Sequence, residues 1–152
     1  MNGARNPVSI ALVAAQFVLL ALLASPLSDF VPASPLRLVG LASLVGGIAL
    51  ALWAARSMRA TRFSVLPEPR DGGTLVERGP YRVVRHPMYA AVLVCGLGAC
   101  IAHGDARHWL WFGLLGIVLW LKIRREERFL LAAYPGYADY RRRVGALVPG
   151  MI

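Results

Sequence analysis

Two adjacent glutamates, Glu126 and Glu127, follow a long apolar run and stand among basic residues. Lys122 precedes Glu126 by four residues, so on a helix these two side chains share a face. A pair of this kind can be a solvated ion pair that contributes only about 0.3–0.5 kcal/mol. Two carboxylates among so many arginines also suit a bound cation. The spacing therefore indicates a site for a positively charged ligand, with the surface ion pair as its alternative.

A second group of polar residues occupies 73–89, at the end of a stretch rich in proline and glycine that separates two apolar runs. The stretch 56–86 is about thirty residues long, and loops of this length in a compact protein are usually functional or disordered. Residues 73–89 mix turn signals with valines, leucines and tyrosines, which argues against disorder. The alternative is a surface linker whose arginines contact lipid phosphates and whose tyrosines anchor at the interface.

The elements that must position these groups are apolar helices. The composition is 57% apolar and 16% charged, against roughly 45–50% and 25% in soluble domains. We therefore predict an all-α integral membrane protein, a single domain over 1–152, with about four transmembrane helices. The expected spans are 8–24, 38–55, 87–103 and 107–124, with a loop over 56–86 and a tail over 125–152 that ends in an amphipathic segment.

The fourth span contains only 13 uncharged residues, from Trp109 to Leu121. That run is too short to cross a bilayer alone, because a span needs roughly 20 residues. Lys122 and Arg124 are therefore expected to extend their charged groups towards the lipid head groups while the helix continues.

The basic residues predict the orientation. Of the 17 lysines and arginines, 15 fall on one side of a four-helix arrangement that places both termini together. The positive-inside rule assigns that side to the cytoplasm. We expect a protein of the bacterial inner membrane with cytoplasmic termini, and the net charge of +9 then reflects topology and anionic lipid rather than a nucleic-acid partner.

The remaining chemistry-bearing residues have plainer interpretations. Cys95 and Cys100 lie inside an apolar run and are predicted to be buried free thiols. His103 and His108 belong to the opposite side of the membrane and are interpreted as interfacial polar residues rather than metal ligands. The tail 134–144, with its tyrosines and arginines, suits either a short helix on the lipid surface or a cover for a pocket.

The order of the motifs resembles the integral-membrane isoprenylcysteine carboxyl methyltransferases and their bacterial relatives, which share it with phospholipid N-methyltransferases. The resemblance covers about half of the chain, roughly 73–149. It rests on two motifs in the right order and at the right separation, which makes it more specific than either motif alone. The residues that carry it are Leu75, Val76, Gly79, Tyr81, Arg85, His86, Pro87 and Tyr89, followed by Glu126, Glu127 and Leu130.

The resemblance implies methyl transfer from S-adenosyl-L-methionine at the cytoplasmic face of the membrane. In such enzymes the cofactor is held by the loop before the segment that corresponds to 85–89, by the histidine and tyrosine of that segment, and by the first glutamate of the pair. The sequence departs from the eukaryotic pattern at Gly73, where histidine is common, at Ala91, where glycine is usual, and at Lys122, where an arginine meets the substrate. Carried over by position, the cofactor-binding residues are Thr74, Leu75, Val76, Tyr81, His86, Pro87, Met88, Tyr89 and Glu126.

Such a reaction asks little of the side chains, because an in-line displacement needs mainly alignment and exclusion of water. A carboxylate acceptor is already ionised at neutral pH, and Lys122 or Arg125 would orient it. An amine or thiol acceptor must lose a proton, for which His86 or Glu127 would be the base. These four form the predicted catalytic set.

The acceptor is expected to be an amphiphilic small molecule or a lipidated substrate that enters from the bilayer between the third and fourth helices. Glycines in these helices provide either space for entry or close helix packing; they are Gly96, Gly98, Gly113 and Gly116.

Three other functions are compatible with an apolar helical chain. A sterol-reductase-like enzyme has related architecture and would bind NADPH. A small transporter needs a charge within the membrane, and the first three spans contain none. A purely structural membrane protein predicts that His86 and Glu126 contribute to no ligand site.

Overall fold

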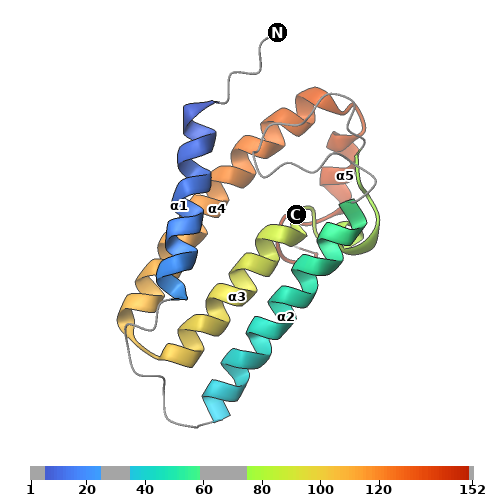
Figure 1. Ribbon diagram of the computed structural model, residues 1–152. Coiled ribbons are helices and arrows are strands. Elements are labelled where there is room, and N and C mark those ends of the chain that lie inside the picture. The colour runs from blue at the N-terminus through green and yellow to red at the C-terminus, as the bar shows by residue number, and fades with distance from the viewer. Residues whose placement is uncertain (1–5, 25–34, 59–74, 151–152) are drawn as a thin grey trace.

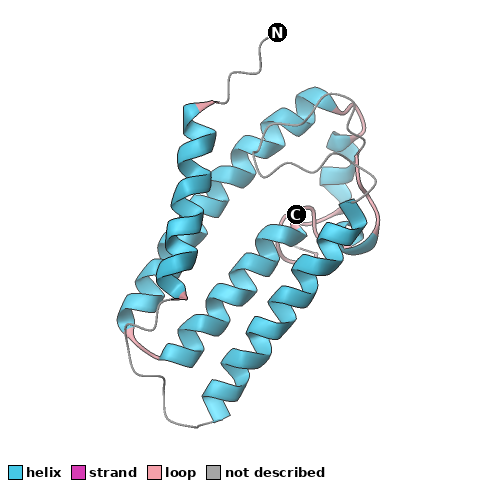
Figure 2. Ribbon diagram, viewed as in Figure 1, coloured by secondary structure: helices cyan, strands magenta, loops and turns pink. Residues whose placement is uncertain are grey.

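The computed structural model describes residues 6–24, 35–58 and 75–150, and in these residues it is helical without a strand (Figures 1 and 2). This agrees with the predicted all-α class. The elements in chain order are α1 (Pro7–Leu23), α2 (Pro35–Met58), the 3-10 turn η1 (Gly79–Arg82), α3 (Pro87–His103), α4 (Ala106–Ala133) and α5 (Tyr137–Arg143).

Local sequence explains where several helices begin and end. Pro7 and Pro87 occupy first positions, where a helix needs no amide hydrogen. The Asn6 and Asp105 side chains cap α1 and α4 by accepting hydrogen bonds from backbone N–H groups. Gly104 ends α3 with φ 72°, a left-handed conformation that favours glycine. Each predicted apolar run therefore forms a helix, and the first three helices lie close to the expected bounds.

The four long helices differ in whether their length and composition suffice to cross a membrane. By length and composition, α2 and α4 qualify as spans, whereas α1 and α3 are apolar helices of 17 residues each. Many large apolar side chains on the helices point outwards, among them Phe17, Leu38 and Trp120. Outward apolar surface is what a lipid-facing helix requires.

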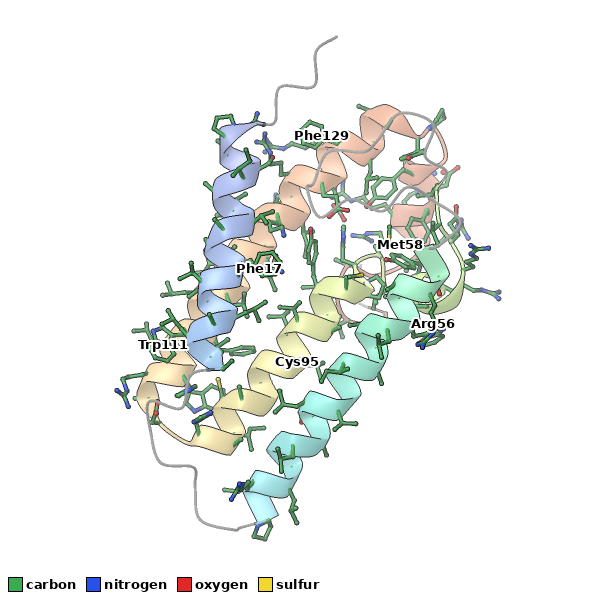
Figure 3. All side chains as sticks on the ribbon, viewed as in Figure 1. Phe17, Arg56, Met58, Cys95, Trp111 and Phe129 are labelled. Atoms are coloured by element: carbon green, nitrogen blue, oxygen red, sulfur yellow. The ribbon has the colours of Figure 1, made fainter. Side chains whose placement is uncertain are left out.

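Helix α4 continues to Ala133, past the predicted end of the fourth span at residue 124, as expected for a helix that extends beyond the bilayer. The acidic pair therefore lies on the same helix as Lys122. Figure 3 shows Met58 and Phe129 towards one end of the molecule and Trp111 near the other. The end of α2, the start of α3 and the later part of α4 thus meet at a common end, which also carries α5 (Figure 1).

The helices pack as two pairs, α1 with α4 and α2 with α3 (Figure 1). Glycines bring α2 and α3 together: a Cβ on Gly98 would lie 2.6 Å from the Gly40 carbonyl oxygen. Gly96 faces Phe112 of α4, so Gly96 and Gly98 serve close packing. Gly113 and Gly116 are different, because no described atom beyond their chain neighbours and the nearby backbone of α4 lies within 4 Å of their Cβ positions.

The two histidines at the opposite end, predicted to be interfacial polar residues, have buried side chains. His103 and His108 are 8% and 0% exposed, and their rings stack with centroids 4.0 Å apart. Asp105, which caps α4, also lies 2.8 Å from His108 Nδ1. The tight turn between α3 and α4 folds one imidazole onto the other. Among the described residues, no group of three or more His, Cys, Asp or Glu side chains could hold a metal ion.

Candidate active site

The segment before α3 is fixed by the C-terminal end of the chain. Tyr137, Tyr140 and Val144 form a buried cluster on and after α5, and Val84 pairs with Gly145 in a parallel bridge. The His86 amide donates to the Ala146 carbonyl oxygen at 3.0 Å. The tyrosines of α5 therefore face inwards, against the segment that leads into α3, and hold this segment in place.

Glu127 lies at the centre of a buried charge network. Its Oε1 accepts a hydrogen bond from Arg85 Nε at 3.0 Å and lies 3.4 Å from His86 Nε2, while Oε2 lies 3.4 Å from Arg141 Nε. This part of α4 follows the span predicted to end near residue 124. Burial by itself raises the pKa of Glu127. The hydrogen bond from His86 and the charge of Arg85 outweigh that effect and lower the pKa to about 2.

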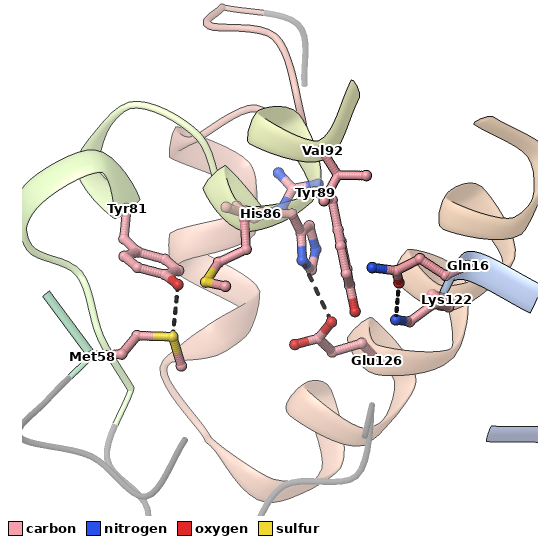
Figure 4. Close-up of a pocket in the computed structure, with 10 residues that line it drawn as sticks. Gln16, Met58, Tyr81, His86, Tyr89, Val92, Lys122 and Glu126 are labelled. Atoms are coloured by element: carbon pink, nitrogen blue, oxygen red, sulfur yellow. Dashed lines mark hydrogen bonds and ion pairs between the residues drawn. The ribbon is translucent and has the colours of Figure 1, made fainter. Parts of the chain in front are cut away.

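A pocket that is partly open to solvent lies beside this network (Figure 4). It combines residues from four separate parts of the chain: α1, the end of α2, the segment from η1 into α3, and α4. It is lined by Gln16, Met58, Tyr81, Arg85, His86, Met88, Tyr89, Val92, Lys122 and Glu126.

Tyr89 stands in the middle of the pocket, with His86 on one side and Lys122 on the other (Figure 4). Its ring stacks on His86 with centroids 5.6 Å apart, and Lys122 Nζ lies 5.0 Å from the ring centroid. Oε2 of Glu126 lies 3.7 Å from His86 Nδ1. The Glu126 side chain is 29% exposed. Its carboxylate therefore remains accessible from the pocket.

Lys122 does not extend towards head groups as predicted for the end of the fourth span. It is 1% exposed, and its ammonium group donates to Gln16 Oε1 from α1 (Figure 4). The helix places Lys122 one turn before Glu126, on the face that lines the pocket. The packing of α1 against α4 then encloses the charged group, and a glutamine satisfies it in place of water.

Tyr81 lines the opposite part of the pocket, beside Met58. Its hydroxyl lies 2.7 Å from Met58 Sδ, and its backbone carbonyl accepts a 2.5 Å hydrogen bond from the Tyr140 hydroxyl. Burial, aided by the negative charge of Glu126, raises the pKa of Tyr81 above its ordinary value. Tyr81 is therefore protonated at neutral pH, and its hydroxyl donates its one hydrogen to Met58 Sδ.

The structure brings together six of the predicted site residues, which are Tyr81, His86, Met88, Tyr89, Lys122 and Glu126. Arg125 lies elsewhere: its Nε donates to Ser9 Oγ at 2.9 Å, and its guanidinium covers the Phe129 ring. Glu127 faces the buried network instead of the pocket.

Four further predicted positions lie outside the pocket lining or outside the described part. Leu75 packs against the tyrosine cluster of α5, and Val76 is half-buried. Pro87 is buried at the first turn of α3. Thr74 is outside the described residues, so its predicted role stays a prediction.

Sequence reasoning missed four pocket residues: Gln16, Met58, Arg85 and Val92. Gln16 had a usable signal, because it is a polar side chain within the apolar run 8–24, and such residues often contact a neighbouring helix. Met58 and Val92 carry no comparable signal, since they resemble any other apolar residue near a helix end.

Comparison with known proteins adds independent evidence. The Cobalt-zinc-cadmium resistance protein CzcN of Cupriavidus metallidurans (strain ATCC 43123 / DSM 2839 / NBRC 102507 / CH34) is 40% identical over 84 residues. This alignment covers 53% of the chain but only 38% of that relative. The profile of the phospholipid methyltransferase family matches residues 36–136. Because that match covers more than half of the chain and includes both motifs, the chain belongs to the phospholipid methyltransferase family of membrane methyltransferases.

Proposed function

We propose that the protein transfers a methyl group from S-adenosyl-L-methionine to an amphiphilic acceptor at the cytoplasmic face of the membrane. The observation that carries this proposal is the pocket in which Glu126, His86, Tyr89 and Lys122 converge. It combines residues from both family motifs. The proposed acceptor group is the carboxylate of an isoprenylcysteine-like or lipid-like molecule.

The pocket suits the cofactor in its chemistry. Glu126 offers a partly exposed carboxylate to a ligand with an ammonium group and hydroxyls. Tyr81 and Met88 supply a hydroxyl and a polarisable side chain beside it. We assign Tyr81, His86, Met88 and Glu126 to holding the cofactor.

When bound, the cofactor supplies an electrophilic methyl group on a sulfonium. The chain must then orient an acceptor and keep water away from it. Lys122, enclosed between α1 and α4, provides a positive charge that orients a carboxylate. Met88 and Val92 provide apolar pocket wall on α3 that suits the tail of an amphiphile.

A carboxylate acceptor needs no base, whereas an amine or a thiol does. His86 is placed for that task, because its Nδ1 lies 3.7 Å from Glu126 Oε2 on the pocket side. Its other ring nitrogen, Nε2, faces Glu127. In this proposal His86 accepts a proton at Nδ1, and Glu127 keeps the ring oriented through Nε2.

Calorimetric titration of the detergent-purified chain with S-adenosylhomocysteine tests the proposal. We expect micromolar binding that weakens at least tenfold, about 1.4 kcal/mol, in a Glu126→Gln variant. Glu77→Gln is the matched control, because Glu77 pairs with Arg143 at the surface and should bind as the parent does. A folded parent that ignores S-adenosylhomocysteine but binds NADPH would support the reductase alternative instead.

A further inference from the structure

Gln16 is a pocket residue that lies outside the family match, which begins at residue 36. It comes from α1 and is 7% exposed. Its side-chain carbonyl oxygen accepts a hydrogen bond from the Lys122 ammonium group, across 106 positions of sequence (Figure 4). The pocket is therefore completed by a helix that the matched region does not contain.

The partner of Lys122 is neutral, which is unusual for so deeply buried a cation. Buried lysines are generally paired with a carboxylate, because removing an ammonium group from water is costly. Among the described residues, no carboxylate lies within 4.0 Å of Lys122 Nζ. The negative charge of Glu126, one turn along the same helix face, acts on Lys122 from beyond that distance, and its carboxylate forms an ion pair with His86.

A glutamine satisfies Lys122 without cancelling its charge. The ammonium group has three N–H donors, of which Gln16 accepts one, and the Tyr89 ring face adds only a cation–π contact. A glutamate at position 16 would neutralise the group. The amide leaves a positive charge and further donors for a ligand in the pocket.

The pocket thus separates two charges with the Tyr89 ring between them. The Glu126 carboxylate lies on the His86 side, and the Lys122 ammonium group lies on the Gln16 side (Figure 4). A cationic cofactor and an anionic acceptor would bind such a pocket together without either meeting a like charge.

We propose that Gln16 is a specificity-determining residue: by holding Lys122 through a neutral amide, it makes the pocket select acceptors that are anionic at the reacting end and reject cationic ones. This inference rests on the proposed methyltransferase function and deepens it. Gln16 acts through Lys122 and is a positioning residue.

The test measures binding of radiolabelled dodecanoate and dodecylamine, which share one tail, to the immobilised full chain saturated with S-adenosylhomocysteine. We expect the parent to prefer dodecanoate. Gln16→Glu should weaken dodecanoate binding at least tenfold and leave dodecylamine binding equal or stronger. Phe17→Leu, at an exposed neighbouring position of α1, is the matched control and should behave as the parent does.

An exchange variant separates charge selection from a general defect in packing. Gln16→Lys combined with Lys122→Gln restores one ammonium group and one amide between α1 and α4, and it should recover the preference for dodecanoate. Equal binding of both probes by the parent, or unchanged dodecanoate binding in Gln16→Glu, would overturn the inference while S-adenosylhomocysteine still binds. A parent that fails to bind S-adenosylhomocysteine would instead remove the proposed function, and the inference with it.

Discussion

Glu126 and Glu127 are neighbours in sequence, but their side chains contact different parts of the molecule. Successive helix positions point about 100° apart, since a turn contains 3.6 residues. Glu126 therefore reaches the pocket, while Glu127 turns towards Arg85, His86 and Arg141. The first is available to a ligand, and the second holds the segment that carries His86. The acidic pair thus combines the proposed binding role of Glu126 with a structural role of Glu127.

Glu127→Gln should destabilise the protein, because it leaves Arg85 buried without its carboxylate. Breaking a buried pair costs about 3–5 kcal/mol, which corresponds to a fall in Tm of roughly 6 °C or more for a chain of this size. The measurement is thermal unfolding in detergent at pH 7. Asp139→Asn is the control, because the Asp139–Arg142 pair is exposed and should contribute little.

The difference in Tm between the parent and Glu127→Gln should depend on pH. The folded-state pKa of Glu127 is about 2, below its ordinary value of 4.5, so its stabilising contribution is complete above pH 4.5 and is lost as pH falls towards 2. The difference in Tm between parent and Glu127→Gln should therefore narrow as pH falls from 5 to about 2. A constant difference over that interval would show that the charge of Glu127 is not what stabilises the fold.

At the scale of elements, α2 and α3 form the closest helix pair, and glycines at their contact allow it. A Cβ on Gly98 would meet two backbone atoms of α2, the Gly40 oxygen at 2.6 Å and the Leu44 nitrogen at 3.0 Å. Backbone cannot move aside as a flexible side chain does. The contact bears on the site, because α2 supplies Met58 and α3 supplies Tyr89 to the same pocket.

Gly98→Ala should lower stability by about 1–3 kcal/mol through overpacking. Gly113→Ala makes the same chemical change on α4, where no described atom beyond its chain neighbours and the nearby backbone of α4 lies within 4 Å of the Cβ position. It should be neutral or stabilising by up to about 1 kcal/mol, because alanine favours helices. Thermal unfolding of the two variants tests this prediction. Equal losses of stability would mean that overpacking at the α2–α3 contact does not cause the loss in Gly98→Ala.

At the scale of the whole molecule, the pocket lies at one end of the helices. The turn between α3 and α4, with Arg107, lies at the other end (Figure 1). The tail with α5 packs against the pocket end through its buried tyrosines. Positive charge enriched at the pocket end would keep that end on the cytoplasmic side during membrane insertion. S-adenosyl-L-methionine is available on that side for the proposed reaction.

Cysteine labelling tests this orientation in intact bacterial cells whose outer membrane has been made permeable. With a membrane-impermeant maleimide, Arg107→Cys should be labelled from outside, and Asp139→Cys only after the inner membrane is opened. Both positions are exposed. The parent chain controls for Cys95 and Cys100, which are half-buried and buried. Labelling in the reverse order would place the pocket on the periplasmic side and contradict the prediction.

The sequence by itself determined the helical class, the approximate bounds of the four apolar helices, the two motifs and the family. These features are local along the chain: apolar runs define helices, and caps such as Asn6 and Asp105 define their ends. The tertiary structure decided which face of each helix met which partner. It enclosed Lys122 with Gln16, turned Glu127 towards Arg85, and stacked His103 on His108. Those contacts depend on how whole helices pack against one another, and a residue's type and spacing within its own helix do not specify them.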